Sequence, residues 1–114
     1  FNLVIIMSLI LYLSFIYMSN FKNISVEEAK ELLRADNYLI DFRDKESFSI
    51  SHVQGALNLS DENIDDFIKN SKKNRPTIIY CYKGISSQKL AHYLSTQGFK
   101  NAYSVDGGFE NWKE

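Results

Sequence analysis

Apolar residues change their spacing repeatedly between residue 24 and the C-terminus, from short continuous runs to helical periods. Continuous apolar runs of this length are typical of strands buried in a parallel sheet. They predict strands at 38–42, 56–59, 77–81 and 101–105. The run Thr77-Ile-Ile-Tyr-Cys81 carries the strongest strand signal, so it is expected to lie at the centre of the sheet.

Helix signals lie between these runs. Ser25 and Glu28 form a capping-box pattern ahead of an apolar face that includes Ala29. The other predicted helical segments are a turn opened by Asp44, a helix capped by Ser60 or Asp61, a helix capped by Ser86 or Ser87 and stopped by Gly98, and a short helix after Asp106-Gly-Gly108. Strands and helices alternate, which predicts an α/β fold with a central parallel sheet flanked by helices on both faces.

Length and composition limit the number of domains and the kinds of partner and cofactor that can be expected. The chain has 114 residues, which suits one domain with one core. The net charge is -1 and there is no long basic run, so nucleic acid is not expected as a partner. A single cysteine allows no disulfide and no Cys-rich zinc site, and no metal or other cofactor is expected. A lone cysteine fits a reducing compartment, or a thiol kept for reaction.

Residues 1–17 differ from the rest because they carry no charge and consist mainly of Leu, Ile, Val, Phe and Met. We therefore divide the chain into an apolar stretch, 1–17, and a domain, 18–114. With residues 18–21 added, a helix rising about 1.5 Å per residue would just cross a hydrocarbon core of roughly 30 Å. The stretch is interpreted either as a membrane anchor or as upstream sequence wrongly joined to a protein that starts at Met18. A signal peptide fits less well, because basic residues and a small-residue cleavage site are missing.

Both interpretations place the domain in the same compartment. If the anchor is genuine, Lys22, Lys30 and Arg34 follow it and no basic residue precedes it. The positive-inside rule then puts the domain on the cytoplasmic side of the inner membrane. If the protein starts at Met18, it is expected to be cytoplasmic. A membrane is therefore a partner only in the first case.

The candidate chemistry lies where the strongest strand ends. Cys81 begins the loop Cys81-Tyr-Lys-Gly-Ile-Ser86, which leads directly into a predicted helix. Ligands of open α/β sheets bind at the carboxyl ends of strands, and a helix N-terminus offers unpaired N–H groups. Gly84 allows the loop to turn its amides inward as an anion nest. We interpret Cys81 as a nucleophile; the alternative is a buried, inert cysteine.

The pKa of a free thiol shows how much stabilisation the Cys81 thiolate needs at neutral pH. A thiol with a pKa of about 8.5 is only about 3% ionised at pH 7. A helix dipole contributes at most about 2 kcal/mol, or roughly 1.5 pKa units, which leaves the thiol about half ionised. Loop amides and the Lys83 ammonium are expected to supply the remainder, and Lys83 also offers a cation to an anionic substrate.

Several segments together resemble the rhodanese-type sulfurtransferase family. The loop 81–86 resembles its six-residue active-site loop. Asp41-Phe-Arg43 and His52-Val-Gln-Gly-Ala-Leu-Asn58 resemble its N-terminal signature, and Asp106-Gly-Gly-Phe-Glu-Asn-Trp112 resembles its C-terminal signature. Residues 18–26 are similar to the start of the short single-domain thiosulfate sulfurtransferases of the GlpE type, which favours Met18 as the start.

The resemblance implies a rhodanese-like fold and a covalent, ping-pong transfer of sulfur. The Cys81 thiolate would take the outer sulfur of thiosulfate, release sulfite, and pass the persulfide sulfur to cyanide or to the thiol of a small molecule or protein. The resemblance also implies that the loop binds the substrate through Tyr82, Lys83, Gly84, Ile85 and Ser86, with Lys83 facing the sulfonate oxygens. Because there is no second cysteine, sulfur cannot be relayed within the chain.

The other polar residues of these segments are assigned mainly structural roles. In the family, an Arg at the position of Arg43 lies beneath the loop. An ion pair with an Asp or Glu and a contact with substrate both stay open for it, and we keep it as a candidate substrate-binding residue. Asp41 and His52 are expected to order their surroundings rather than to transfer protons. His92 is expected at the surface or in packing.

Residues of the loop 81–87 also bear on other functions of the same fold. Phosphatases and arsenate reductases of the same fold use a loop one residue longer that Arg closes. Ser87 occupies that position here, so a bidentate clamp on phosphate is missing. A non-catalytic binding module usually lacks the cysteine, which this chain keeps. A membrane-tethered carrier that hands sulfur to a specific partner shares the chemistry and differs in its acceptor.

Overall fold

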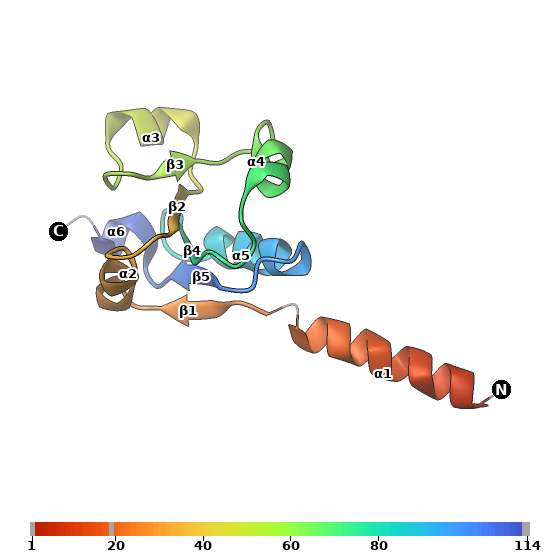
Figure 1. Cartoon of the computed structure of the whole chain (residues 1–114). Coiled ribbons are helices and arrows are strands. Elements are labelled where there is room, and N and C mark those ends of the chain that lie inside the picture. Colours follow the sequence, from red (N-terminus) through yellow and green to blue (C-terminus); the bar gives the residue numbers. More distant parts are fainter. Residues whose placement is uncertain (1, 19, 113–114) are drawn as a thin grey trace.

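The chain folds around a parallel sheet. The computed structural model describes residues 2–18 and 20–112. Its elements are α1 (Asn2–Met18), β1 (Lys22–Ile24), α2 (Val26–Leu32), β2 (Tyr38–Asp41), α3 (Lys45–Ile50), β3 (Leu57–Asn58), α4 (Ile64–Asn70), β4 (Thr77–Tyr80), α5 (Ser86–Thr96), β5 (Ala102–Val105) and α6 (Gly108–Trp112). The strands pair in parallel in the spatial order β1-β5-β4-β2-β3 (Figure 1). β4 therefore lies at the centre, as its apolar sequence predicts.

Helices cover both faces of the sheet because successive residues of β4 point to opposite sides. Ile79 packs with Leu90 and Leu94 on the face covered by α4 and α5. Ile78 packs with Ala29 on the other face, which α2 and α6 cover. The predicted α/β fold, with a parallel sheet flanked on both faces by helices, is thereby confirmed.

Three predicted helix boundaries are confirmed, two by individual hydrogen bonds and one by its backbone conformation. Ser25 Oγ accepts from the Glu28 N–H at 3.0 Å, and the Glu28 carboxylate accepts from the Ser25 N–H at 2.9 Å. Asp44 caps α3 by accepting from the Ser47 N–H at 3.3 Å. Gly98 ends α5 with a φ of 101°, a left-handed conformation that glycine adopts without strain.

Besides the start of α5, which is described below, two features of the fold differ from the predictions. The N-cap position of α4 is Asn63, which makes no side-chain cap bond, rather than Ser60 or Asp61. Asn63 Oδ1 accepts from the Ser60 N–H and its Nδ2 donates to Asn58 O, so the residues after β3 form a separate polar turn before the helix. β1 was not predicted, because only its last residue is buried and its pairing with β5 supplies most of its definition.

α1 is the apolar N-terminal stretch, and in Figure 1 it projects away from the edge of the sheet at β1. Its side chains from Leu3 to Leu13 are exposed. Among the described residues, no helix combines the length and the apolar character needed to cross a membrane. The division of the chain into 1–17 and 18–114 stays a prediction.

Candidate active site

Cys81 follows β4 directly, and only 1% of its surface is exposed. Its Sγ accepts hydrogen bonds from the backbone N–H groups of Gly84, at 3.2 Å, and Ser87, at 3.3 Å. The thiol is also 3.2 Å from Ser87 Oγ, to which it donates. The loop therefore turns its amides toward the sulfur, an arrangement that stabilises negative charge on it.

Opposing effects set the pKa of the Cys81 thiol. Burial is the largest single influence and raises the pKa. Hydrogen bonds that the hydroxyls of Ser86 and Ser87 and the amides of Ser87 and Gly84 make with the thiolate lower it, and together they leave the pKa below its ordinary value. These donors are all neutral. Lys83, which the sequence suggested as a further contributor, is exposed and is not among these principal groups.

The predicted capping role of Ser86 and Ser87 is wrong. The N-cap of α5 is Ile85, which makes no side-chain cap bond, and Ser86 is already the first helical residue. Ser87 is fully buried, and its Oγ lies close to Cys81 Sγ and 2.7 Å from Ser104 Oγ. The Ser87 hydroxyl thus turns toward the sulfur instead of back to the helix amides. Ser104 had no sequence signal, because β5 is brought beside α5 only in the fold.

The turn before α6 supports the Cys81 loop through close backbone contacts. Gly84 has a φ of +91°, and a Cβ there would lie 2.8 Å from Gly107 N. Gly108 has a φ of +61°, and a Cβ there would lie 2.5 Å from Cys81 O. The Phe109 N–H donates to the same carbonyl at 2.7 Å. Gly84 in the loop and Gly108 in the C-terminal signature are therefore needed for this approach of two backbones.

The outer side chains of the loop face solvent. Lys83 and Ile85 are exposed, and Tyr82 is 46% exposed. The Tyr82 hydroxyl hydrogen-bonds the Asp44 carboxylate and lies 3.2 Å from Ser47 Oγ. Tyr82 thus ties the loop to the start of α3, a contact that the sequence did not indicate.

Arg43 forms a buried ion pair with Asp41, with Nη2 2.8 Å from Oδ2 and Nε bonded to the same carboxylate. Nη2 also donates to Ser51 O at 2.6 Å, and the Tyr80 hydroxyl donates to Asp41 at 2.6 Å. The guanidinium carbon lies 4.0 Å from the centroid of the Phe109 ring. The hydrogen bond with Asp41 raises the pKa of Arg43, and burial, followed by the bond to Asp41, raises the pKa of Tyr80. Arg43 therefore has a structural role, and its contact with substrate stays a prediction.

The histidines have no hydrogen bond to Cys81 in the described part of the chain. His52 Nδ1 lies 2.7 Å from Phe48 O, and the two rings stack with centroids 3.8 Å apart, which agrees with the structural role expected for His52. His92 is exposed on α5. Within residues 2–18 and 20–112, no group of His, Cys, Asp and Glu side chains is arranged to hold a metal ion.

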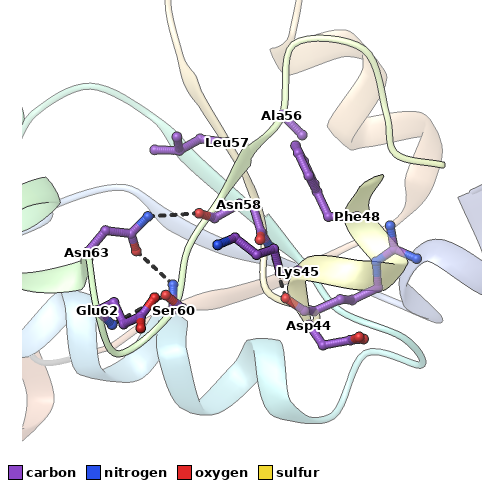
Figure 2. A pocket seen from close by; sticks show the side chains of 10 residues that line it. Asp44, Lys45, Phe48, Ala56, Leu57, Asn58, Ser60, Glu62 and Asn63 are labelled. Atoms are coloured by element: carbon purple, nitrogen blue, oxygen red, sulfur yellow. Dashed lines mark hydrogen bonds between the residues drawn. The ribbon is translucent and has the colours of Figure 1, made fainter. Parts of the chain in front are cut away.

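A cavity of about 460 Å³ lies at the same edge of the sheet, beyond the ends of β2 and β3. Figure 2 shows its lining side chains, which come from the start of α3 on one side and from β3 and the turn before α4 on the other. The lining residues are Arg43, Asp44, Lys45, Phe48, Ala56, Leu57, Asn58, Ser60, Glu62 and Asn63. Sequence reasoning missed this cavity, because it forms between segments that are separated in the chain.

Known proteins with similar sequences belong to one family. Residues 25–114 match the rhodanese-like domain family. A protein named thiosulfate sulfurtransferase GlpE from Shewanella oneidensis is 45% identical over 98 residues, which covers 85% of this chain and 97% of that protein. The protein of the same name from Pseudomonas entomophila is 45% identical over 96 residues, which covers 84% and 88%.

Solved structures share the fold. A rhodanese-like domain protein from Staphylococcus aureus superimposes with a TM-score of 0.70 at 28% identity, over 80% of this chain and 90% of that one. The rhodanese-like domain of a protein from Anabaena sp. does so with a TM-score of 0.71, over 80% and 72%; at 21% identity it shows the fold alone. The resemblance seen in the sequence motifs is confirmed, and the chain belongs to the rhodanese-like domain family.

Proposed function

We propose that the protein is a thiosulfate sulfurtransferase with Cys81 as its nucleophile. The observation that carries the proposal is the set of hydrogen bonds at Cys81 Sγ, because donors aimed at the sulfur stabilise the thiolate that must attack. Relatives that are 45% identical over most of this chain are named for the same activity. The proposed chemistry uses no cofactor.

In the first half-reaction, the Cys81 thiolate attacks the outer sulfur of thiosulfate. A new S–S bond forms to Sγ, the S–S bond of thiosulfate breaks, and sulfite leaves with the bonding electron pair. In the second half-reaction, cyanide or a thiolate attacks the outer sulfur of the persulfide. Thiocyanate or an acceptor persulfide forms, and Sγ leaves as the thiolate. The donors around Sγ therefore stabilise the same charge before attack and after departure.

The loop is proposed to bind the donor. Lys83 is exposed, and its ammonium offers a cation to the sulfonate of thiosulfate. The Gly84 amide faces the reacting sulfur, and Tyr82, Ile85 and Ser86 complete the surroundings of the approaching substrate. Arg43 is proposed mainly to support this arrangement. Its Nε and Nη2 are committed to Asp41 and Ser51, so any contact with substrate falls to Nη1.

A second candidate is a carrier that hands its persulfide sulfur to one protein partner. The exposed apolar side chains of Tyr82 and Ile85, 46% and 68% exposed, favour a protein acceptor because they flank the nucleophile. The first half-reaction is the same in both cases. A phosphatase is not supported, since buried Ser87 stands where a phosphate-binding Arg would be needed.

The proposed location of the domain is the cytoplasm, because a free reactive thiol persists in a reducing compartment. α1 allows two arrangements. Either the protein is free in the cytoplasm, or the apolar stretch attaches it to the inner membrane with the domain on the cytoplasmic side. Fractionation of cells into membrane and soluble parts, with and without residues 1–17, separates the two.

Intact-mass spectrometry tests the proposed activity. The full chain is mixed with thiosulfate, freed of excess reagent, and weighed before and after addition of cyanide. We expect a gain of one sulfur atom, removed by cyanide and absent from Cys81→Ser. No gain in the native protein would reject thiosulfate as the donor, and a gain in Cys81→Ser would reject Cys81 as the nucleophile. Comparing turnover with cyanide, small thiols and reduced protein thiols then separates the enzyme from the carrier.

A further inference from the structure

A chain of hydroxyl groups leads from the Cys81 sulfur into the sheet. Ser87 Oγ lies 3.2 Å from Cys81 Sγ and 2.7 Å from Ser104 Oγ. Ser87 is in the first turn of α5, Ser104 is in β5, and their exposed fractions are 0% and 1%. In the described part of the chain, the only hydrogen-bond partner of Ser104 Oγ is Ser87 Oγ. The Ser104 hydroxyl is therefore linked to the sulfur through Ser87 Oγ.

This row of hydroxyls has one hydrogen too many when the Cys81 thiol donates to Ser87 Oγ, as it does in the structure. The S–H group and two O–H groups bring three hydrogens to two contacts, one between Sγ and Ser87 Oγ and one between the two hydroxyls. Loss of the thiol proton to solvent leaves two hydrogens for two contacts. Ser104 then donates to Ser87, and Ser87 donates to the thiolate. Both hydroxyls only rotate and no O–H bond breaks. Because a buried hydroxyl without an acceptor is costly, the arrangement favours the anion.

We propose that Ser104 is a positioning residue that acts through Ser87. By donating to Ser87 Oγ, it aims the Ser87 hydroxyl at the Cys81 sulfur whenever that sulfur carries negative charge. A hydrogen bond to an ion is roughly twice as strong as a neutral one, and a second bond in series strengthens it by about 10–30%. The inference rests on the proposed role of Cys81, but its readout is the ionisation of the thiol and needs no sulfur transfer.

Charged groups around the loop act separately from this chain. In the residues that the structure describes, none of them forms a hydrogen bond with Sγ. They are Lys83 in the loop, Asp41 and Arg43 at the end of β2, Asp44 at the start of α3, and Asp106 and Glu110 beside and within α6. The hydroxyl of half-buried Ser86 also lowers the pKa of Cys81, but it is not part of the pair formed by Ser87 and Ser104.

The test is the pH dependence of Cys81 alkylation by iodoacetamide in the full chain, with thiosulfate absent. Cys81 is the single cysteine, so the signal is unambiguous. We expect Ser87→Ala to raise the pKa of Cys81 by about one unit, equivalent to about 1.4 kcal/mol. Ser104→Ala should raise it by about 0.1–0.3 unit, since the second bond in series strengthens the first by about 10–30%. The double variant should shift it no further than Ser87→Ala, because Ser104 acts only through Ser87.

Two further variants serve as controls. Ser104→Thr keeps a hydroxyl on a strand residue and should restore the native pKa of Cys81. Ser95→Ala removes another buried serine hydroxyl of α5, one that donates to His92 O at 2.6 Å, and should leave that pKa unchanged. Ser86→Ala should add its own shift to that of Ser104→Ala, because the two hydroxyls act independently.

An unchanged pKa of Cys81 in Ser104→Ala would overturn the proposal, and a loss of stability alone would assign Ser104 to packing. Additive shifts in the Ser87 and Ser104 double variant would also overturn it. If Ser87→Ala does not fold, the comparison of Ser104→Ala with Ser104→Thr decides. Failure of the native protein to take sulfur from thiosulfate would reject the proposed function and leave these pKa values as they are.

Discussion

Two neighbouring polar clusters at the carboxyl edge of the sheet use opposite kinds of groups. The donors around Cys81 Sγ are neutral amides and hydroxyls. One strand away, Asp41 and Arg43 form a buried ion pair that Tyr80 joins through its hydroxyl. β2 and β4 pair so that Asp41 lies opposite Tyr80, the residue before Cys81. The charged cluster therefore holds the end of β4 in place, and the neutral cluster surrounds the group whose charge changes in the proposed reaction.

The physical reason for this division lies in the persulfide state. In the proposed reaction, the negative charge lies on Cys81 Sγ before attack and on the outer sulfur once the persulfide has formed. A buried cation fixed against Sγ would lose its direct partner in the second state, at a cost of several kcal/mol. Neutral dipoles stabilise the charge on Sγ and leave no buried cation unpaired when that charge moves to the outer sulfur. The buried ion pair beside the loop is compensated within itself and is insensitive to the reaction.

The largest effect on this comparison is expected from removing the sulfur. Cys81→Ser should abolish sulfur loading, because a hydroxyl forms no persulfide and is scarcely ionised near neutral pH. The free energy of unfolding should change by less than about 1.5 kcal/mol, since a serine oxygen keeps hydrogen-bond capacity toward Gly84 and Ser87. Intact-mass spectrometry and urea unfolding measure the two quantities. Residual loading in this variant would contradict the assignment of the nucleophile.

Breaking the charged cluster should instead affect stability. Asp41→Ala leaves the buried Arg43 guanidinium without its counter-ion and should lower the free energy of unfolding by about 3–5 kcal/mol. Urea unfolding measures the loss. Asp36→Ala is the matched control, because Asp36 meets Arg75 at the surface with a 3.7 Å contact and should change stability little. Equal losses in the two variants would show that burial of the ion pair is unimportant.

Gly84→Ala should disturb the neutral cluster through the backbone. The added Cβ would lie 2.8 Å from Gly107 N at a φ of +91°, so the loop must shift and the Gly84 amide must leave the sulfur. We expect a slower loading of sulfur and a loss of about 1–3 kcal/mol in unfolding free energy. Gly55→Ala is the control. Gly55 has nearly the same φ, +88°, and an added Cβ there would have no atom within 4 Å, so this variant should show the effect of backbone strain alone. A loading rate that falls equally in both variants would argue against the contact.

The smallest effect is expected at the exposed rim of the loop. Lys83→Ala should raise the KM for thiosulfate several-fold and leave kcat nearly unchanged, because an exposed ammonium contributes about 1 kcal/mol or less to binding an anion. Steady-state kinetics with cyanide as acceptor measure both constants. Lys89→Ala, an exposed lysine of α5, is the control. Loss of turnover with an unchanged KM would assign Lys83 to the chemical step.

Local patterns predicted the elements whose signals lie within a few residues. Ser25, Asp44 and Gly98 begin or end helices where expected, because capping depends on neighbouring backbone groups. The end of the apolar run at Cys81 likewise marks the end of the central strand. Features with partners far away in the chain were missed. β1 is defined mainly by its pairing with β5, and Asn63 takes its role from contacts with the end of β3 and the turn that follows.

By itself, the sequence determined the parallel α/β fold and the family, and it predicted Cys81 as the nucleophile. Apolar runs, helix caps and motif residues are each recognised from the order of residues within a short stretch of the chain. Only the tertiary structure decided which groups surround the sulfur and which carboxylate holds Arg43. Ser87, rather than the expected Lys83, makes hydrogen bonds with Cys81 Sγ, and Ser104 of β5 makes one with Ser87. Such partners meet only when sheet pairing and helix packing bring distant segments together, and no local pattern of residues encodes that meeting.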